Sequence, residues 1–308
     1  MSKDIERITL IAKPSSGYEL LDSGGEEKLE RYGDVVLARP DPQALWEKSL
    51  PESEWAKADG RYVREGREGK WDIKKELPKE WPIEFGPPAG GLKFLIRPTS
   101  FKHTGLFPEQ LSNWEWVGEK IAKAGRPISV LNLFAYTGGA TLAALKAGAF
   151  VTHVDASKTA VAWARKNAEL SGLTEKPVRW ITEDVLVFLG REVKRGVHYD
   201  AIIMDPPAFG HGPKDELWKI EENLLELMKL CLELLSEKPL FVLMSGYAAG
   251  YSPLAFGYNL EPFVKKFGGG VTCGDLTIQE STRSTSSGQE RGRLLPCGIF
   301  ARWSSDNN

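Results

Sequence analysis

Residues 128–156, ISVLNLFAYTGGATLAALKAGAFVTHVDA, form the stretch that decides the fold. Residues 128–134 are almost all apolar, which is typical of a strand buried on both faces of a parallel sheet. Thr137, Gly138 and Gly139 end this run, and the two glycines allow a tight turn and a close approach of the backbone to a ligand. Residues 140–147 are rich in Ala and Leu and predict a helix. Residues 150–154 predict the next strand, with Asp155 at its carboxyl end.

This order of strand, turn, helix, strand and acid is typical of cofactor sites in α/β proteins. Ligands of an open α/β sheet bind beyond the carboxyl ends of its strands, where Asp155 could accept both hydroxyls of a ribose. A dinucleotide site needs Gly-x-Gly-x-x-Gly, and the turn FAYTGG at 134–139 lacks that spacing. The turn instead resembles the first motif of class I methyltransferases, which bind S-adenosylmethionine. A glycine turn that only packs helices, with a surface Asp beside it, is the alternative for this stretch alone.

Composition and charge limit the class of protein. The 308 residues suit one large domain or two, and 42% of them are hydrophobic. A net charge of −2 indicates no general affinity for nucleic acid or membranes, although a local basic face is compatible with it. Cys231, Cys273 and Cys297 lie far apart in the chain, so we expect reduced thiols and no metal site. The charged start lacks an apolar signal core, and no apolar run approaches the ~20 residues of a membrane span, so we expect a cytoplasmic protein.

Residues 1–100 differ in pattern from the rest of the chain. Turn signals separate short β-type pieces at 18–21, 35–39, 61–64, 81–85 and 92–97, which predicts a small β-rich domain for substrate recognition. Tryptophans are concentrated here, and we interpret most of them as core residues rather than stacking platforms for unpaired bases. The basic stretch 57–79 is interpreted as a solvated face, with contact to a phosphate backbone as the alternative. A polar junction, 98–110, leads into a predicted helix at 111–124.

From residue 157 onward, helices and strands alternate. Helices are predicted at 157–170, 185–193, 215–235 and 254–267, and strands at 178–182, 199–204, 239–245, 271–278 and 294–303. This alternation predicts an α/β fold with a mostly parallel sheet, to which the last two strands add an antiparallel hairpin. Residues 101–308 are therefore expected to form the cofactor-binding domain.

Polar residues stand at the ends of four predicted strands. In chain order these ends carry the 137–139 turn, Asp155, Asp184 and Asp205, and a parallel sheet would bring them to one crevice. Asp155 would hold the ribose. Asp184 or the backbone amide of Val185 would meet the edge of an adenine. Asp205 would stand where a methyl group leaves.

The sequence Asp205-Pro206-Pro207 is the most informative local motif. Two prolines fix the backbone and remove two N–H donors, so the carbonyls of Asp205 and Pro206 become fixed acceptors for an amine. Phe209 could stack on a flat base, as enzymes that flip a base require. Taken alone, the motif could also be a rigid strand exit followed by a core Phe.

Residues 98–303 resemble the class I S-adenosylmethionine-dependent methyltransferases, which have a Rossmann-like fold. The whole chain resembles the family of bacterial large-subunit rRNA cytosine-5 methyltransferases. The motifs that carry the resemblance are HTGLFPEQ at 103–110, NLFAYTGG at 132–139, ARKNA at 164–168, DPPAF at 205–209, and the acids Asp155 and Asp184. The resemblance implies rRNA as the usual substrate and a small β-rich domain ahead of the core. It places the cofactor at Phe107, Gln110, Phe134, Ala135, Thr137, Gly138, Gly139, Asp155, Ala156, Asp184, Val185 and Asp205.

Two departures from the family pattern change the expected chemistry. The family's type member carries an N-terminal PUA domain, for which too few residues precede the β-rich region here. It also needs a cysteine nucleophile at the end of the fifth strand, where this chain has Ser245-Gly246-Tyr247. Carbon 5 of a pyrimidine is methylated only after a thiolate adds at carbon 6, so we expect direct methylation of a nitrogen instead.

The sequence therefore predicts methyl transfer to an RNA base, with large-subunit rRNA as the first choice and Asp205, Pro206 and Phe209 as the catalytic residues. A protein side chain or a small heterocycle is the alternative substrate. A different class of function is an RNA-binding module that keeps the cofactor fold without turnover, and a NAD-linked dehydrogenase ranks behind both. The target nucleotide, the methylated atom and the oligomeric state are not determined by the sequence.

Overall fold

The chain divides into two compact units. Its computed structural model describes residues 5–65, 68–74, 76–86, 91–100, 102–212, 216–247, 250–281, 283–285, 288–290 and 292–305. Unit 1 comprises Met1–Leu10, Ser112–Leu276 and Gly298–Asn308, and unit 2 comprises Ile11–Leu111 and Thr277–Cys297. The division into domains at residue 100 stays a prediction, and the structure groups Thr277–Cys297 with the N-terminal residues.

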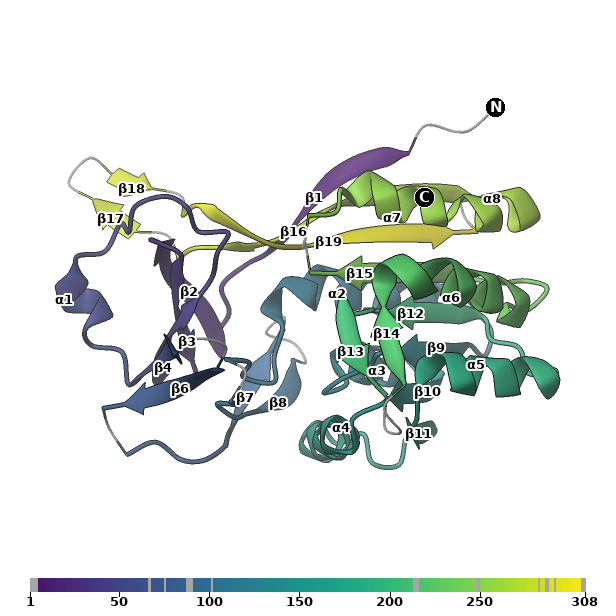
Figure 1. Ribbon diagram of the computed structural model, residues 1–308, viewed down its shortest axis with the longest axis horizontal. Helices are drawn as coiled ribbons and strands as arrows, with labels where there is room; N and C mark the ends of the chain where they lie inside the picture. The colour runs from purple at the N-terminus through teal and green to yellow at the C-terminus, as the bar shows by residue number, and fades with distance from the viewer. Residues whose placement is uncertain are drawn as a thin grey trace. The chain divides into compact units, whose positions relative to one another are not determined.

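An eight-stranded sheet is the centre of unit 1, in the order β1-β16-β19-β15-β12-β9-β10-β11 (Figure 1). The parallel strands are β15 (Phe241–Gly246), β12 (Ala201–Met204), β9 (Ser129–Leu133), β10 (Phe150–Asp155) and β11 (Val178–Thr182). Strand β19 (Leu294–Ser304) pairs antiparallel with β15, and β16 (Gly270–Gln279) and β1 (Glu6–Ala12) complete the sheet. The predicted α/β fold with a mostly parallel sheet and antiparallel C-terminal strands is confirmed. Because the five strands are parallel, their carboxyl ends meet at one edge.

Helices connect these strands. They are α2 (Leu111–Lys123), α3 (Gly139–Lys146), α4 (Lys158–Leu170), α5 (Val185–Lys194), α6 (Ile220–Leu234), α7 (Pro253–Asn259) and α8 (Glu261–Phe267). The hydroxyl of Ser157 caps α4 by accepting from the Ala160 N–H at 3.2 Å. No helix in the described part of the chain is long and apolar enough to cross a membrane.

Two predicted helices of unit 1 are wrong in part. The helix expected at 215–235 begins only at Ile220. The residues after β12 instead form a hairpin of β13 (Phe209–His211) and β14 (Leu217–Lys219). The helix expected at 254–267 is divided at Leu260 into α7 and α8. Pro262 lies in the first turn of α8, where its missing N–H costs nothing, so a new helix begins there.

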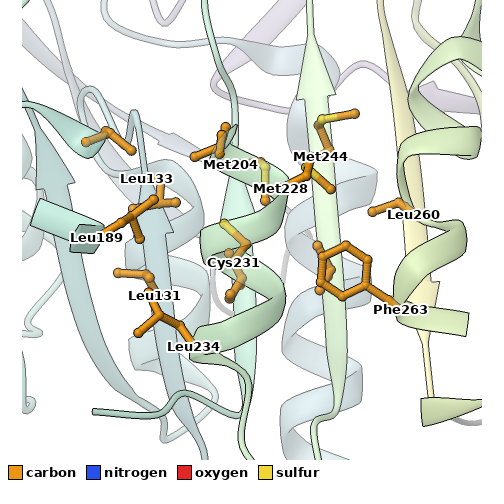
Figure 2. Packing of buried hydrophobic residues seen from close by; sticks show 14 of the residues in the cluster. Leu131, Leu133, Leu189, Met204, Met228, Cys231, Leu234, Met244, Leu260 and Phe263 are labelled. Carbon is orange, nitrogen blue, oxygen red and sulfur yellow. The ribbon is translucent and has the colours of Figure 1, made fainter. Parts of the chain in front are cut away.

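The apolar core of unit 1 lies between the sheet and the helices α5, α6, α7 and α8. Figure 2 shows side chains of α6 packed beside those of the central strands, and the labelled residues are Leu131, Leu133, Leu189, Met204, Met228, Cys231, Leu234, Met244, Leu260 and Phe263. These side chains are at most 5% exposed. Burial of apolar surface contributes a favourable free energy of about 25 cal/mol per Å². This packing stabilises the strands in their register and so fixes the positions of the strand ends. The site described below is built on that register.

Unit 2 is rich in β structure. Its five-stranded sheet has the order β2 (Tyr18–Gly24), β3 (Glu27–Tyr32), β4 (Val35–Pro40), β5 (Gly60–Glu65) and β6 (Glu68–Ile73). The remaining elements are α1 (Glu52–Trp55), the hairpin of β7 (Trp81–Phe85) and β8 (Leu92–Ile96), η1 (Pro108–Gln110), and the hairpin of β17 (Arg283–Thr285) and β18 (Gly288–Glu290). All five predicted β pieces are strands, whereas β1, β3 and β6 were not predicted because charged residues interrupt their apolar pattern.

The core of unit 2 contains a buried ionic network. Glu30 is fully buried, and its carboxylate accepts from the Tyr18 hydroxyl at 2.8 Å and from Arg39 Nε at 2.7 Å. The Arg39 and Lys28 cations hold the pKa of Glu30 below its ordinary value, although burial opposes them. Trp55 is fully buried as well, and its Nε1 donates to Asp22 at 2.9 Å. Trp55 therefore fits the core interpretation of the N-terminal tryptophans.

Candidate active site

The turn after β9 has an uncommon backbone conformation. Phe134 and Tyr136 have positive φ angles of 53° and 47°, which few residues other than glycine adopt. The turn is held from both sides, because the Tyr136 N–H donates to Asp155 Oδ2 at 2.8 Å and Asn167 Nδ2 donates to the Thr137 carbonyl at 2.9 Å. A strained turn that is held in place by surrounding hydrogen bonds is a common feature of ligand sites.

Both glycines of the turn are required by packing. Gly138 has a φ of 87°, and a Cβ on it would lie 3.0 Å from the Cβ of Ala164 in α4. A Cβ on Gly139 would lie only 2.1 Å from Cζ2 of Trp114 in α2. The two glycines therefore allow the close packing of neighbouring helices, as the alternative interpretation of this turn proposed. Their contact with a cofactor stays a prediction.

Asp155 ends β10 beside this turn. Its Oδ1 accepts from the Ser157 N–H at 2.8 Å, while Oδ2 accepts from Tyr136. Burial raises the pKa of Asp155, and the two backbone hydrogen bonds oppose that rise. A carboxylate has about four acceptor positions, so one on each oxygen is left for a pair of hydroxyls. The remaining acceptor positions of Asp155 thus fit the ribose hydroxyls of the predicted cofactor, and the adjacent Ala156 is only partly buried.

Asp184 lies at the same edge of the sheet, one strand further. Asp155 pairs with Thr182 in the β10–β11 register, and Asp184 follows two residues later. Its Oδ1 accepts from the Val187 N–H at 3.0 Å and so caps α5, whose first residue is the buried Val185. Asp184 therefore has a structural role in addition to the adenine contact predicted for it.

Asp205 follows β12 at the next strand end. Met204 pairs with Met244 in the parallel register of β12 and β15, so Asp205 comes beside Ser245. The two side chains are hydrogen-bonded, and the hydroxyl donates to the carboxylate. Burial raises the pKa of Asp205 to about 6, whereas the bond from Ser245 lowers it. Solvent still reaches Asp205 at this open strand end, although the protein atoms around its carboxyl displace much of the water.

The Asp-Pro-Pro exit is fixed by Trp218. Trp218 Nε1 donates to the Pro207 carbonyl at 2.6 Å, and its ring packs against Phe134 with 4.8 Å between centroids. Among the described residues, the buried Pro206 carbonyl accepts no backbone hydrogen bond. Phe209 is 57% exposed, so it is not the core residue that the structural alternative required.

The structure brings together most of the predicted site residues. Those in unit 1 lie at the carboxyl edge of the sheet: Phe134, Ala135, Thr137, Gly138, Gly139, Asp155, Ala156, Asp184, Val185, Asp205, Pro206 and Phe209. Phe107 and Gln110 belong to unit 2, in and beside η1, and their part in the site stays a prediction. Ser245 and Trp218 were missed as contributors, because only the strand order and the β13–β14 hairpin show which residues they contact.

The three cysteines are free and buried. Cys231 lies on α6, Cys273 on β16 and Cys297 on β19, and all three are buried. Burial raises the pKa of each thiol. No cluster of three or more His, Cys, Asp or Glu suited to a metal ion occurs in the part of the chain that the structure describes.

A Rossmann-like sheet with a turn and carboxylates at one edge fits the class I methyltransferases, and the comparison with known families confirms the predicted class. Residues 43–235, more than half of the chain, match the family described as S-adenosylmethionine-dependent methyltransferase. The chain belongs to this family, and S-adenosylmethionine is its cofactor.

Solved structures and curated relatives agree with this assignment. A SAM-dependent methyltransferase from Agrobacterium tumefaciens is 38% identical, with a TM-score of 0.90 over 99% of this chain and 97% of that chain. The ribosomal RNA large subunit methyltransferase K/L of Pseudoalteromonas atlantica is 29% identical over 92% of this chain and 40% of that protein. The protein of the same name from Shewanella sp. strain MR-4 is 34% identical over 67% of this chain and 27% of that protein. The chain thus spans less than half the length of these two relatives.

Proposed function

We propose that this chain methylates a nitrogen of an RNA base, with large-subunit rRNA as the substrate class. The names of the two curated relatives support the substrate class, although each relative is more than twice as long as the matched region. The observation that carries the proposal is the end of β12, where the solvent-exposed Asp205 is followed by the Pro206 carbonyl, which accepts no backbone hydrogen bond from the described residues.

Each residue at this edge has a defined part in the proposed reaction. Bound S-adenosylmethionine supplies an activated methyl group, and Asp155 holds the ribose through the acceptor positions that Tyr136 and Ser157 leave. Asp205 and the Pro206 carbonyl accept hydrogen bonds from the substrate amine and aim its lone pair at the methyl carbon. Alignment of this kind contributes several kcal/mol to the lowering of the barrier.

Asp205 is also suited to accept the proton that the substrate nitrogen loses after methylation. The amine nitrogen becomes cationic as it takes the methyl group and must then lose a proton. A carboxylate with a pKa of about 6 is ionised at neutral pH and can still accept a proton, which is the balance that general base catalysis needs. The exposed ring of Phe209 is available to stack on the base.

Nitrogen is favoured over carbon 5 because no thiolate is available. The thiols of Cys231, Cys273 and Cys297 are buried, and burial keeps them protonated. The strand end that would supply a cysteine carries Ser245, whose hydroxyl donates to Asp205. A nitrogen lone pair needs no covalent enzyme intermediate.

Transfer of a tritiated methyl group tests the proposal. Wild type and Asp205→Asn are incubated with total RNA, ribosomal subunits, protein and small-molecule extracts in parallel. We expect label in rRNA with wild type and a loss of at least about 100-fold with Asp205→Asn, which keeps the shape but not the charge of the acceptor. Label only in protein or small molecules would overturn the substrate class, and RNA binding without any transfer would indicate a non-catalytic module.

A second experiment tests the choice of atom. RNA containing 5-fluorocytosine traps the covalent intermediate of carbon-5 methylation, so we expect no shifted band on a denaturing gel. A band that disappears in Cys297→Ala or Cys273→Ala would show that carbon 5 is the target.

A further inference from the structure

Ser245 is a buried hydroxyl at the edge where the reaction is proposed to occur. It is the penultimate residue of β15 and is 3% exposed. The next residue, Gly246, leaves no room for a side chain, since a Cβ on it would lie 2.9 Å from Cζ of Phe256 and 3.9 Å from the Pro206 carbonyl oxygen. The end of β15 therefore lies beside the Pro206 carbonyl, and the parallel register of β12 and β15 places Ser245 next to Asp205.

We propose that Ser245 is a positioning residue, whose hydroxyl holds the Asp205 carboxylate in the orientation that meets the substrate amine. This inference rests on the proposed function, in which Asp205 is the acceptor. It assigns a role to a strand end that, in the cytosine-5 methyltransferases, would have to supply a nucleophile. Here the same place supplies a hydrogen-bond donor.

The surroundings of Asp205 make this donor important. Strands β9, β12 and β15 carry no ionisable side chain, so no charge on them stabilises the carboxylate. Burial and the Ser245 bond are the causes of the pKa shift of Asp205, and they act in opposite directions. His211 on β13 and Tyr247 after β15 are the ionisable groups that follow these two strand ends.

The test compares Ser245→Ala with two other variants. Ser245→Thr keeps a hydroxyl at the same position of β15. Ser304→Ala is a matched control, because Ser304 is a buried serine of the neighbouring β19, pairs with Phe241 at the far end of β15, and has a hydroxyl that bonds to none of the described residues. A hydrogen bond to a charged group corresponds to about ten-fold or more, so we expect Ser245→Ala to lower kcat about ten-fold at pH 6.5.

The pH profile separates positioning from a general loss of structure. Loss of the bond should move the acid limb of log kcat upward by about one pH unit in Ser245→Ala. We expect Ser245→Thr to restore most of the rate, Ser304→Ala to match wild type, and the KM for S-adenosylmethionine to change little in all three. An unshifted acid limb in Ser245→Ala, or an equal loss in Ser304→Ala, would overturn the proposal.

A measurement without substrate makes this result independent of the proposed function. Carboxyl ¹³C resonances of labelled aspartate report the titration of Asp205 directly, with Asp205→Asn identifying its signal. We expect Asp205 to titrate at higher pH in Ser245→Ala than in wild type. If wild type transfers no methyl group to RNA but this shift is observed, the proposed function fails, and only the hydrogen bond of Ser245 to Asp205 stands without a role toward a substrate amine. If transfer is observed and the shift is absent, the role of Ser245 is refuted.

Discussion

Replacement of Asp155 by Ala should weaken S-adenosylmethionine binding strongly. The carboxylate of Asp155 already accepts the Tyr136 and Ser157 N–H groups, each at 2.8 Å, so its orientation is fixed before the cofactor arrives. Two further hydrogen bonds, to the ribose hydroxyls, are expected from its remaining acceptor positions. Hydrogen bonds to a charged group contribute about 1.5–3 kcal/mol each, so the pair corresponds to at least about 3 kcal/mol, or roughly 150-fold in Kd.

Isothermal titration of the cofactor into wild type and Asp155→Ala measures this loss. Asp200→Ala is the matched control, because Asp200 stands just before the other end of β12 and its carboxylate accepts from the Ser129 N–H at 2.9 Å. It should lower the free energy of unfolding without changing the Kd. An affinity in Asp155→Ala within about three-fold of wild type would refute the assignment of the ribose site. Equal weakening in Asp200→Ala would show that the loss arises from destabilisation of the sheet.

Two further predictions concern stability. Because the pKa of Asp205 is raised from 3.8 to about 6 in the folded state, the native protein binds this proton more tightly than the unfolded chain and loses stability as the pH rises through that window. Asp205→Asn should therefore have a higher Tm than wild type at pH 8 and the same Tm at pH 4, and a lower Tm at pH 8 in calorimetry would contradict this. Gly139→Ala places a Cβ 2.1 Å from the Trp114 ring, so urea unfolding should show a loss of about 1–3 kcal/mol, and an unchanged midpoint would show that the ring can move away.

The shared position of the predicted cofactor-binding residues at one sheet edge could be predicted from sequence because these residues are close together in the chain. The turn at 134–139 and Asp155 belong to one strand–helix–strand unit, whose order in the chain already determines that both lie at the same edge of a parallel sheet. Asp184 and Asp205 follow by the same rule once their strands are recognised. The apolar runs that mark these strands reflect burial on both faces, which is the strongest signal that a parallel sheet gives.

The missed features depend on contacts between segments far apart in sequence. Ser245 meets Asp205 only because β15 is the neighbour of β12 in the sheet. The local sequence of neither strand shows that the two are neighbours. The β13–β14 hairpin replaced the first part of a predicted helix because Trp218 reaches back to the Pro207 carbonyl, a contact that competes with helix formation. The grouping of Thr277–Cys297 with unit 2 likewise rests on distant pairs, such as the Ser23 N–H and Glu280 at 2.9 Å.

Because all three thiols are buried, their reaction with a thiol reagent would report the unfolding of the protein around them. Cys231 and Cys273 belong to unit 1 and Cys297 to unit 2, and none is more than 5% exposed. A thiol reagent should leave the native chain unmodified and label each cysteine only when the surrounding unit opens. Peptide mass spectrometry after a labelling pulse would then give separate opening rates for the two units without any engineered probe. Added S-adenosylmethionine should slow labelling at Cys231 and Cys273, since a ligand that binds only the folded sheet reduces the population of its open forms.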